Sequence, residues 1–340
     1  MDIFIKCDKI STINFYLYKM FSKWTIAVVI SAAAIAGFFA IKSVQDYKQQ
    51  GKTIAIIKSV DHPALDMTAE GIISEVKKSN IDIGIIYESA QGDNSLAQQI
   101  VQKFIQQKVN VIVPIGTTVA QVAAQKTKTI PIVFASVTDP IASGIVKNLE
   151  RPEGNVTGVS NFSGDITAKQ FEFYKKLLPN LKKIGVIYNS GESNSVTLVE
   201  KIKIEAEKNG IEVKEIVIQS TNDAILAVKS LIGSIDALLV DNDNTALSAI
   251  KGIVDVASKA SVPVLSGDID TVAVGVLAAV GPDQYKLGER AGEFIVKIVK
   301  DNTPVAEIPV AFASDLEYLV NREVADKLQV TIPDQAKVYQ

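Results

Sequence analysis

Short apolar runs and longer amphipathic stretches alternate along the chain from residue 52 onward, and the whole order occurs twice. The short runs are rich in Val and Ile, which favours strands, whereas apolar residues spaced three or four apart in the stretches between them favour helices. The expected strands are 53–57, 81–87, 109–113 and 131–134 in the first copy, and 183–188, 213–218, 235–240 and 263–265 in the second. Two copies of one βαβαβαβ unit predict two similar lobes that face each other and close on a small molecule.

The connections between the expected strands indicate the type of sheet. No tight hairpin signal follows these strands, so crossover helices must join them, as in parallel sheets. An extended segment over 154–160 leaves the first lobe, 275–281 returns the chain, and 308–312 crosses a third time. The predicted fold is therefore α/β, with two doubly wound parallel-sheet lobes joined by a three-segment hinge. Lobe one comprises residues 51–160 with 282–308, and lobe two comprises 161–281 with 309–340.

Length, composition and charge agree with two lobes and narrow the functional classes. A chain of 340 residues is too long for one ordinary core, and 47% hydrophobic with 21% charged residues suits sheets buried on both faces. The formal net charge is −3 and the lysines are scattered, which is not the electrostatic footprint of a nucleic-acid-binding protein. We therefore expect no nucleic-acid partner.

Residues 1–50 form a separate segment, in which an uncharged apolar run over 24–41 is close to the length that spans a bilayer. Lysines precede the run, so the positive-inside bias places a cytosolic tail before it and exports everything after it. Ala34-Ile35-Ala36 has the form of a signal-cleavage site, but the apolar residues continue beyond it, which favours a retained helical anchor. Met20 is an alternative start. Both interpretations predict a periplasmic protein, anchored to the inner membrane by an N-terminal helix or released by cleavage.

Residues with metal-binding or nucleophilic chemistry are scarce. The single cysteine, Cys7, precedes the apolar run, so the exported part carries no disulfide, and a lone His62 cannot build a zinc site. Gly-x-Ser-x-Gly, Gly-x-x-x-x-Gly-Lys-Ser/Thr and post-strand Gly-x-Gly-x-x-Gly motifs are absent from the sequence. We therefore expect no enzyme activity, no metal and no cofactor.

Polar residues follow the expected strands, at the sheet edge where ligands bind in open parallel sheets. The candidate ligand-binding residues are His62, Asp66, Thr117, Thr118, Thr138 and Asp139 in lobe one, and Ser190, Asn194, Ser195, Asp243, Asn244 and Asp268 in lobe two. The hydroxyls and helix starts of lobe one suit a carboxylate, and the aspartates of lobe two suit an ammonium group. Phe162, just after the first crossing, is a candidate wall for an apolar ligand.

Each candidate also has a purely structural interpretation. Ser, Thr, Asp and Asn are the preferred N-caps of helices, and for any one of these positions capping is at least as probable as ligand contact. His62 alone is more typical of a turn residue before a proline, and packing in the hinge explains Phe162 equally well. The convergence of six polar loops on one cleft is what favours binding.

Several of these loops match a known family. The matching segments are Asp61-His62-Pro63-Ala64-Leu65-Asp66, Ala90-Gln91-Gly92-Asp93, residues 131–140 with Thr138-Asp139-Pro140, Gly154-Asn155-Val156-Thr157-Gly158-Val159-Ser160, Asp243-Asn244-Thr245, and residues 281–288. From about residue 52 to its C-terminus the chain resembles the TrpX-like family of ABC transporter substrate-binding proteins. The resemblance implies a type I periplasmic-binding fold and uptake of aromatic amino acids. It further implies that Thr117-Thr118 and Thr138-Asp139 hold the amino-acid head group from one side, and Asp243, Asn244 and Asp268 from the other.

The expected function is that of a monomeric solute receptor that closes around a zwitterion and delivers it to an ABC permease in the inner membrane. Tryptophan, phenylalanine or tyrosine is the expected ligand, and Asp243→Ala should weaken its binding by roughly 1.5–3 kcal/mol if Asp243 holds the ammonium. Many relatives in thick-walled bacteria carry a lipid-attachment cysteine; an apolar segment in its place indicates a two-membrane bacterium. A membrane-anchored sensory ectodomain is the alternative, although residues 1–23 leave no room for a cytosolic effector. An α/β enzyme on the same fold would need a catalytic motif that the sequence lacks.

Overall fold

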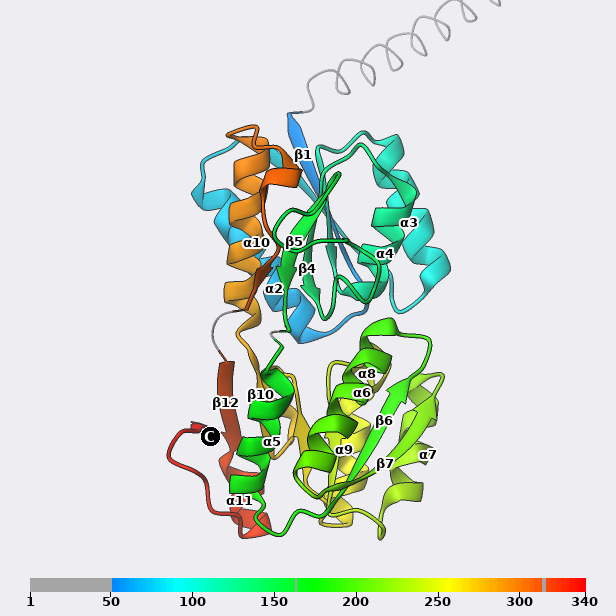
Figure 1. Ribbon diagram of the computed structural model, residues 1–340, viewed down its shortest axis with the longest axis vertical. Helices are drawn as coiled ribbons and strands as arrows, with labels where there is room; N and C mark the ends of the chain where they lie inside the picture. The colour runs from blue at the N-terminus through cyan, green and yellow to red at the C-terminus, as the bar shows by residue number, and fades with distance from the viewer. Residues whose placement is uncertain (1–50, 163, 314–315) are drawn as a thin grey trace, which may run out of the picture. The chain divides into compact units, whose positions relative to one another are not determined.

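The computed structural model describes residues 51–340 apart from 163, 314 and 315, and the expected N-terminal helix over 24–41 lies outside the described residues. From Lys52 onward the chain forms two α/β lobes, each built around one sheet (Figure 1). Within the described ranges, no helix has the length and apolar character needed to cross a membrane. No three or more His, Cys, Asp or Glu residues in the same ranges are grouped so that they could hold a metal ion.

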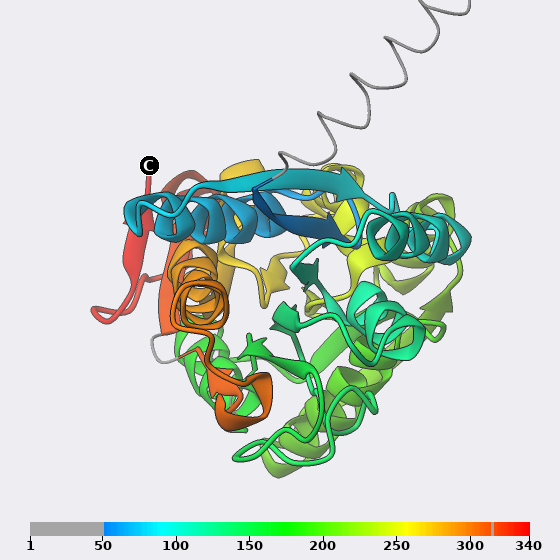
Figure 2. The same cartoon turned by 90° about the horizontal axis from the view of Figure 1, so that it is seen from above.

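A six-stranded parallel sheet forms the centre of lobe one, in the order β11-β5-β4-β3-β1-β2. Its strands are β1 (Lys52–Lys58), β2 (Ile83–Ser89), β3 (Val111–Ile115), β4 (Ile132–Val137), β5 (Val156–Ser160) and β11 (Ala311–Phe312). Helices α3 (Asn94–Gln106) and α4 (Thr117–Lys126) pack on one face, and α2 (Pro63–Lys78) and α10 (Gln284–Val299) on the other (Figure 2). Every residue of β3 is buried because helices cover both faces, which explains its continuous apolar run.

Lobe two has a seven-stranded sheet in the order β13-β12-β10-β9-β8-β6-β7. Its strands are β6 (Lys183–Asn189), β7 (Glu212–Ile218), β8 (Ala237–Val240), β9 (Val264–Ser266), β10 (Ala278–Pro282), β12 (Leu316–Asn321) and β13 (Lys337–Tyr339). Its helices are α5 (Ile166–Leu177), α6 (Ser193–Lys208), α7 (Thr221–Leu231), α8 (Asn244–Ser248), α9 (Ile250–Lys259) and α11 (Arg322–Leu328). One core lies under α5, α6 and α11, and a second lies under α7, α8 and α9, so this sheet is also buried on both faces.

The chain passes between the lobes three times, after β5, after β10 and after β11. The two lobes with parallel sheets confirm the predicted class, but three details differ. β11 pairs with β5 at the edge of the first sheet, so residues 311–312 belong to lobe one and not to lobe two, where the sequence placed 309–340. β12 is antiparallel to β10, because β10 runs toward the hinge and β12 runs away from it. β13, which the sequence did not predict, pairs with β12.

Glycines allow α2 and α10 to pack closely against each other on lobe one. A methyl group at Gly288 would overlap the backbone oxygen of Thr68, and one at Gly71 would overlap that of Tyr285. Gly288→Ala should therefore push the two helices apart and lower the free energy of unfolding by roughly 1–3 kcal/mol, as overpacking of a core does. Urea unfolding measures this change.

Gly252→Ala in α9 is a matched control for that variant. It also replaces a helical glycine, but its methyl group meets only the tip of the Ile225 side chain, at 2.7 Å, which can rotate away. Alanine in a helix interior is favoured over glycine by roughly 1 kcal/mol, so this control should be neutral or stabilising. Equal destabilisation by both variants would contradict the close helix packing.

Candidate ligand-binding site

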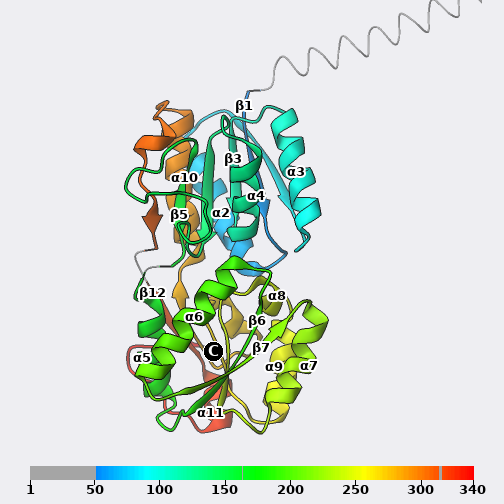
Figure 3. The same ribbon diagram turned by 45° about the vertical axis from the view of Figure 1, so that its right-hand side comes forward.

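A small cavity lies between the lobes, at the ends of the strands where the sequence predicts the ligand. We call it the cleft cavity. Lobe one contributes Val60, His62, Thr117, Ser136, Thr138 and Gln284, and lobe two contributes Asn161, Asn194, Asn242, Asn244, Leu247 and Asp268. Its volume is about 30 Å³, far below the roughly 300–1,000 Å³ of ligand pockets, so a ligand can enter only if the lobes move apart. Helices α4 and α6 also contact each other across the gap (Figure 3).

The N-terminus of α4 is the clearest anion-binding feature of lobe one. Its N-cap, Gly116, has φ 102° and provides no side-chain acceptor for the first N–H groups of the helix. Thr117 opens the helix at the cavity wall, and its Oγ1 lies 3.4 Å from the backbone N of Thr138, which donates to it. Uncapped N–H groups at a helix start attract a carboxylate.

Beside α4, a buried hydrogen-bond network holds the rest of the lobe-one wall in place. Ser136 sits at an irregularity in β4 with φ 53°, a left-handed conformation that is rare outside glycine. Its Oγ donates to Gln284 Oε1 over 3.0 Å, and Thr68 Oγ1 donates to the same oxygen over 3.1 Å. Backbone strain and strand irregularities of this kind occur preferentially at binding sites.

On the lobe-two side, Asp268 is a buried acidic residue that lines the cleft cavity. Only 1% of the residue is exposed; its Oδ1 accepts the backbone N–H of Asp270 over 3.0 Å, while its Oδ2 has no hydrogen-bond partner. Burial raises the pKa of this carboxyl group to about 6. The Oδ1 atoms of Asn161 and Asn194, which also line the cleft cavity, are buried without partners too.

His62 approaches Asp268 from the opposite lobe. Its Nδ1 lies 3.4 Å from Asp268 Oδ2 and 3.3 Å from the backbone N–H of Ala64, from which it accepts. Burial lowers the pKa of His62, so the imidazole is neutral at physiological pH. With Nδ1 accepting from Ala64, two acceptor atoms face each other, and a proton on either the imidazole Nδ1 or the carboxyl group would join them through a hydrogen bond.

Asp243, in contrast, is engaged within lobe two. Its Oδ2 accepts the backbone N–H of Asn189 and its Oδ1 that of Ala246, both over 2.6 Å. Burial, together with the nearby charge of Glu192, raises the pKa of Asp243 to about 6. Asp243 thus caps α8 and joins two loops, and it does not line the cleft cavity.

The remaining predicted residues divide into two groups. Thr118 and Asn244 line a neighbouring inter-lobe cavity. Asp66 accepts hydrogen bonds from Lys58 and Tyr87. Asp139 accepts the backbone N–H of Ala142, and its other carboxylate oxygen lies 3.7 Å from Lys201 Nζ. Ser190 is exposed, and the side chain of Ser195 hydrogen-bonds to Asp243. Phe162 packs in the hinge with Ile166 and Leu198. The structure does not place these five residues in the cleft cavity.

Five residues at or near the site were not predicted as ligand contacts: Asn161, Ser136, Asn242, Gln284 and Glu192. Asn161 directly follows β5, and Gln284 comes two residues after the end of β10. The chain crosses between the lobes after each of these strands, next to the cleft cavity. A polar residue close behind a strand that leads into a crossing is therefore the sequence signal that could have identified Asn161 and Gln284. Glu192 accepts hydrogen bonds from both the backbone and the side chain of Asn244 and of Thr245.

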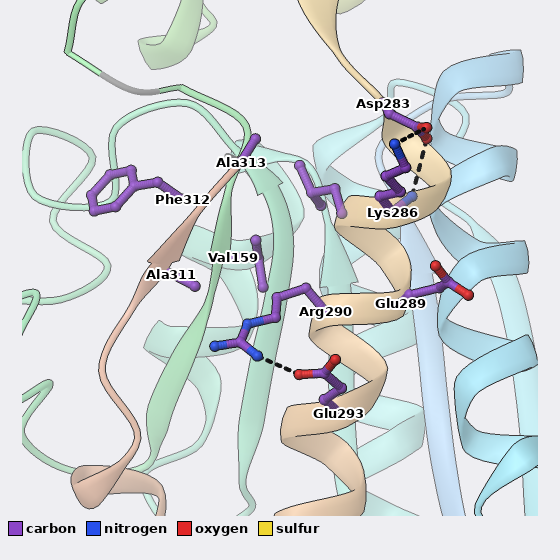
Figure 4. Close-up of a pocket in the computed structure, with 10 residues that line it drawn as sticks. Val159, Asp283, Lys286, Glu289, Arg290, Glu293, Ala311, Phe312 and Ala313 are labelled. Carbon is purple, nitrogen blue, oxygen red and sulfur yellow. Dashed lines mark hydrogen bonds and ion pairs between the residues drawn. The ribbon is translucent and has the colours of Figure 1, made fainter. Parts of the chain in front are cut away.

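A larger hollow of about 440 Å³ lies elsewhere, between α10 and β11 on the side of lobe one (Figure 4). Most of its charged residues pair with one another along α10, Lys286 with Asp283 and Arg290 with Glu293, while Glu289 pairs with Lys78 of α2. It contains none of the candidate residues. Size alone therefore does not mark it as the ligand site.

Known proteins resemble the chain from β1 to its end. Residues 53–340 match the family described as ABC transporter substrate binding protein. A "Tyrosine-binding protein" of Clostridioides difficile is 37% identical, over 84% of this chain and 83% of that protein. The structure of an ABC domain in complex with L-Trp from Streptococcus pneumonia has a TM-score of 0.81 at 33% identity, covering 85% of this chain and 99% of that one.

A third relative indicates how the lobes are arranged. The ligand-free, open structure of a Clostridium difficile substrate binding protein with adhesive properties is 36% identical over the same shares of both chains, but its TM-score is only 0.66. At similar identity, the described part of this chain therefore resembles the L-Trp complex more than the open structure. The match across both lobes, together with 37% identity to a relative of similar extent, shows that the chain belongs to the ABC transporter substrate-binding protein family.

Proposed function

We propose that this protein is an extracytoplasmic receptor that binds a free aromatic amino acid in the cleft cavity and presents it to an ABC permease. The observation that carries the proposal is the convergence of buried oxygens without partners on one cavity: Asn161 Oδ1, Asn194 Oδ1 and Asp268 Oδ2. Buried polar atoms are almost always hydrogen-bonded, so such a cluster indicates a place where a ligand completes the bonding. Two relatives, a tyrosine-binding protein and a protein in complex with L-Trp, support the aromatic class.

The head group would lie across the cleft, with one charge on each lobe. The uncapped start of α4 and the Thr117 hydroxyl receive the carboxylate. The unpartnered Oδ2 of Asp268 receives the ammonium, which replaces its contact with His62. Because each lobe holds one charge, a zwitterion favours the closed arrangement over the open one. The apolar run over 24–41 is proposed to place the receptor outside the inner membrane, as an anchor or a cleaved signal.

Calorimetry with the full-length protein tests this arrangement through analogues of the ligand. Tyrosine, phenylalanine and tryptophan should be compared with tyramine, which lacks the carboxylate, and with N-acetyltyrosine, which lacks the ammonium charge. Tyramine and N-acetyltyrosine should each bind at least about tenfold more weakly than tyrosine, since a hydrogen bond to a charged group contributes about 1.5–3 kcal/mol. If no aromatic amino acid binds, the proposed function is wrong; if tyramine binds as well as tyrosine, the role of α4 is wrong.

The affinity should depend on pH because the ammonium needs an ionised partner. In the ligand-free protein, burial raises the pKa of Asp268 to about 6, so below that pH the ligand must displace a proton. Affinity should be constant above about pH 7 and fall by up to tenfold for each pH unit below 6. Calorimetry from pH 4.5 to 8 measures this profile, in buffers of different ionisation enthalpy that report proton release. A flat profile would contradict contact between the ammonium and Asp268.

A further inference from the structure

The neighbouring inter-lobe cavity, which we call the side cavity, has a volume of about 170 Å³ and opens beside the cleft cavity. The two cavities share Val60 and Asn244 as lining residues. Thr117 and Thr118, consecutive at the start of α4, line one cavity each. The side cavity therefore offers an adjoining space for the side chain of a ligand whose head group lies in the cleft cavity.

The lobe-one wall of the side cavity suits an aromatic ring. Val60, Ala90, Ala97 and Val119 line it and are buried apolar residues, and polar residues of the same lobe line the rest of it: Ser59, Asp93, Asn94 and Thr118. Ala90 and Ala97 are small, so they leave room for a flat group. Its volume is close to the roughly 150 Å³ of an apolar protein cavity that binds benzene. One six-membered ring fits such a space, whereas an indole is larger.

The lobe-two wall is polar and ordered by hydrogen bonds. Thr245 Oγ1 donates to Glu192 Oε1 over 2.8 Å and accepts from Asn189 Nδ2 over 2.9 Å. Asn189 Oδ1 accepts the backbone N–H of Gly191, which fixes the orientation of its amide. An amide nitrogen has two N–H groups, so the second one of Asn189 can donate to a further oxygen.

We propose that the side cavity receives the ring of the ligand and that Asn189 and Thr245 recognise a hydroxyl at its far end. The inference rests on the proposed function and deepens it, because it selects tyrosine over phenylalanine by hydrogen bonding and over tryptophan by size. A site built to hydrogen-bond a hydroxyl rejects the analogue that lacks it, since its own polar groups are then left unpaired.

Thr118→Phe tests the place of the ring. The new side chain fills the side cavity, while the backbone N–H at the start of α4 is retained, so tyrosine affinity should fall at least 100-fold. Thr221→Phe is the matched control: it also replaces a threonine in the first turn of a helix, α7, where the residue is exposed. This control should bind tyrosine as the wild type does. Wild-type affinity of Thr118→Phe would overturn the inference, whereas a wild-type protein that binds no aromatic amino acid would overturn the proposed function instead.

Thr245→Val tests recognition of the hydroxyl, with the ratio of tyrosine to phenylalanine affinity as the readout. The substitution keeps the shape of the side chain and removes its Oγ1, so the partner that orients the Asn189 amide is lost. The wild type should prefer tyrosine over phenylalanine by at least tenfold, and the variant should bring this ratio close to one. A general loss of structure would weaken the binding of tyrosine and phenylalanine equally and leave the ratio of their affinities unchanged. An unchanged ratio would overturn the role of Asn189 and Thr245 in recognising the hydroxyl.

Discussion

Asp268→Asn is expected to weaken binding of the amino acid by roughly 100-fold while stabilising the ligand-free protein. Truncating one partner of a buried charge pair costs about 2–5 kcal/mol, and the amide can no longer attract the ammonium as a carboxylate does. Asparagine keeps the shape of the side chain and the oxygen that accepts the N–H of Asp270, so the local cap is preserved. Calorimetry measures the affinity, and thermal unfolding measures the stability.

The gain in stability follows from the raised pKa of Asp268. An aspartate titrates at about 3.9 when unfolded, and burial raises this pKa to about 6 in the folded protein. The protonated form is therefore favoured by folding, and stability is lost as the pH rises from about 4 to above 6. At pH 7 the ionised group destabilises the ligand-free protein by up to roughly 3 kcal/mol, which the neutral amide removes. The variant should melt at a higher temperature than the wild type at pH 7, with little difference at pH 4.

Asp241→Asn is the matched control for that variant. Asp241 is also buried, has an Oδ2 without a partner and has a pKa raised by burial to about 6, but it does not line the cleft cavity. It should share the gain in stability and keep the affinity. If Asp268→Asn binds as the wild type does, or if Asp241→Asn loses just as much affinity, another group holds the ammonium.

Gly116→Ala should both destabilise the protein and weaken the proposed carboxylate site. Gly116 has φ 102° and ψ 156°, a conformation open almost only to glycine, and a methyl group there would also overlap the Ser59 side chain. Strain and overlap together should lower the free energy of unfolding by roughly 2–4 kcal/mol. Relief of the strain would rotate the first N–H groups of α4, so we expect affinity to fall at least tenfold.

Gly154→Ala is the control that distinguishes the effect of backbone strain from the effect of a substitution at the start of α4. Gly154 has φ 91°, but no atom lies within 4 Å of a methyl group built there, and the residue lies outside both inter-lobe cavities. This variant should lose stability through its backbone alone and keep full affinity. If Gly116→Ala keeps the affinity of the wild type after allowance for unfolded protein, then the carboxylate does not bind at the start of α4.

Much of the architecture could be predicted from the sequence because its signals are local. Runs such as 111–115 are apolar throughout only when both faces of a sheet are covered, and the repeated order sets the number of lobes. The third crossing was misplaced because β11 is only two residues long, too short for any periodic pattern. Its pairing with β5 depends on tertiary packing and not on residues 311–312 themselves.

The candidate site could be predicted from the sequence at the level of loops but not of individual side chains. Six candidates do line the cleft cavity: His62, Thr117, Thr138, Asn194, Asn244 and Asp268. Asp243 and Asp268 are equivalent as sequence, since both are aspartates after buried strands. In the structure, both carboxylate oxygens of Asp243 accept backbone N–H groups, whereas Oδ2 of Asp268 has no hydrogen-bond partner. The local backbone geometry, which the sequence pattern does not reveal, causes this difference. Asn161 and Gln284 belong to the hinge crossings and therefore lay outside the loops that the sequence pattern selects.

The hydrogen bonds of Gln284 bear on which half of the candidate site is formed before the lobes close. Gln284 follows a strand of lobe two, yet its partners, Thr68 and Ser136, both belong to lobe one. Separation of the lobes breaks none of these bonds, so the lobe-one half of the site is already formed in an open receptor. If the ligand binds this half first, Asp268 would join it on closure. Substitutions in lobe one should thus act on the association rate, and substitutions at Asp268 on the residence time of the bound amino acid.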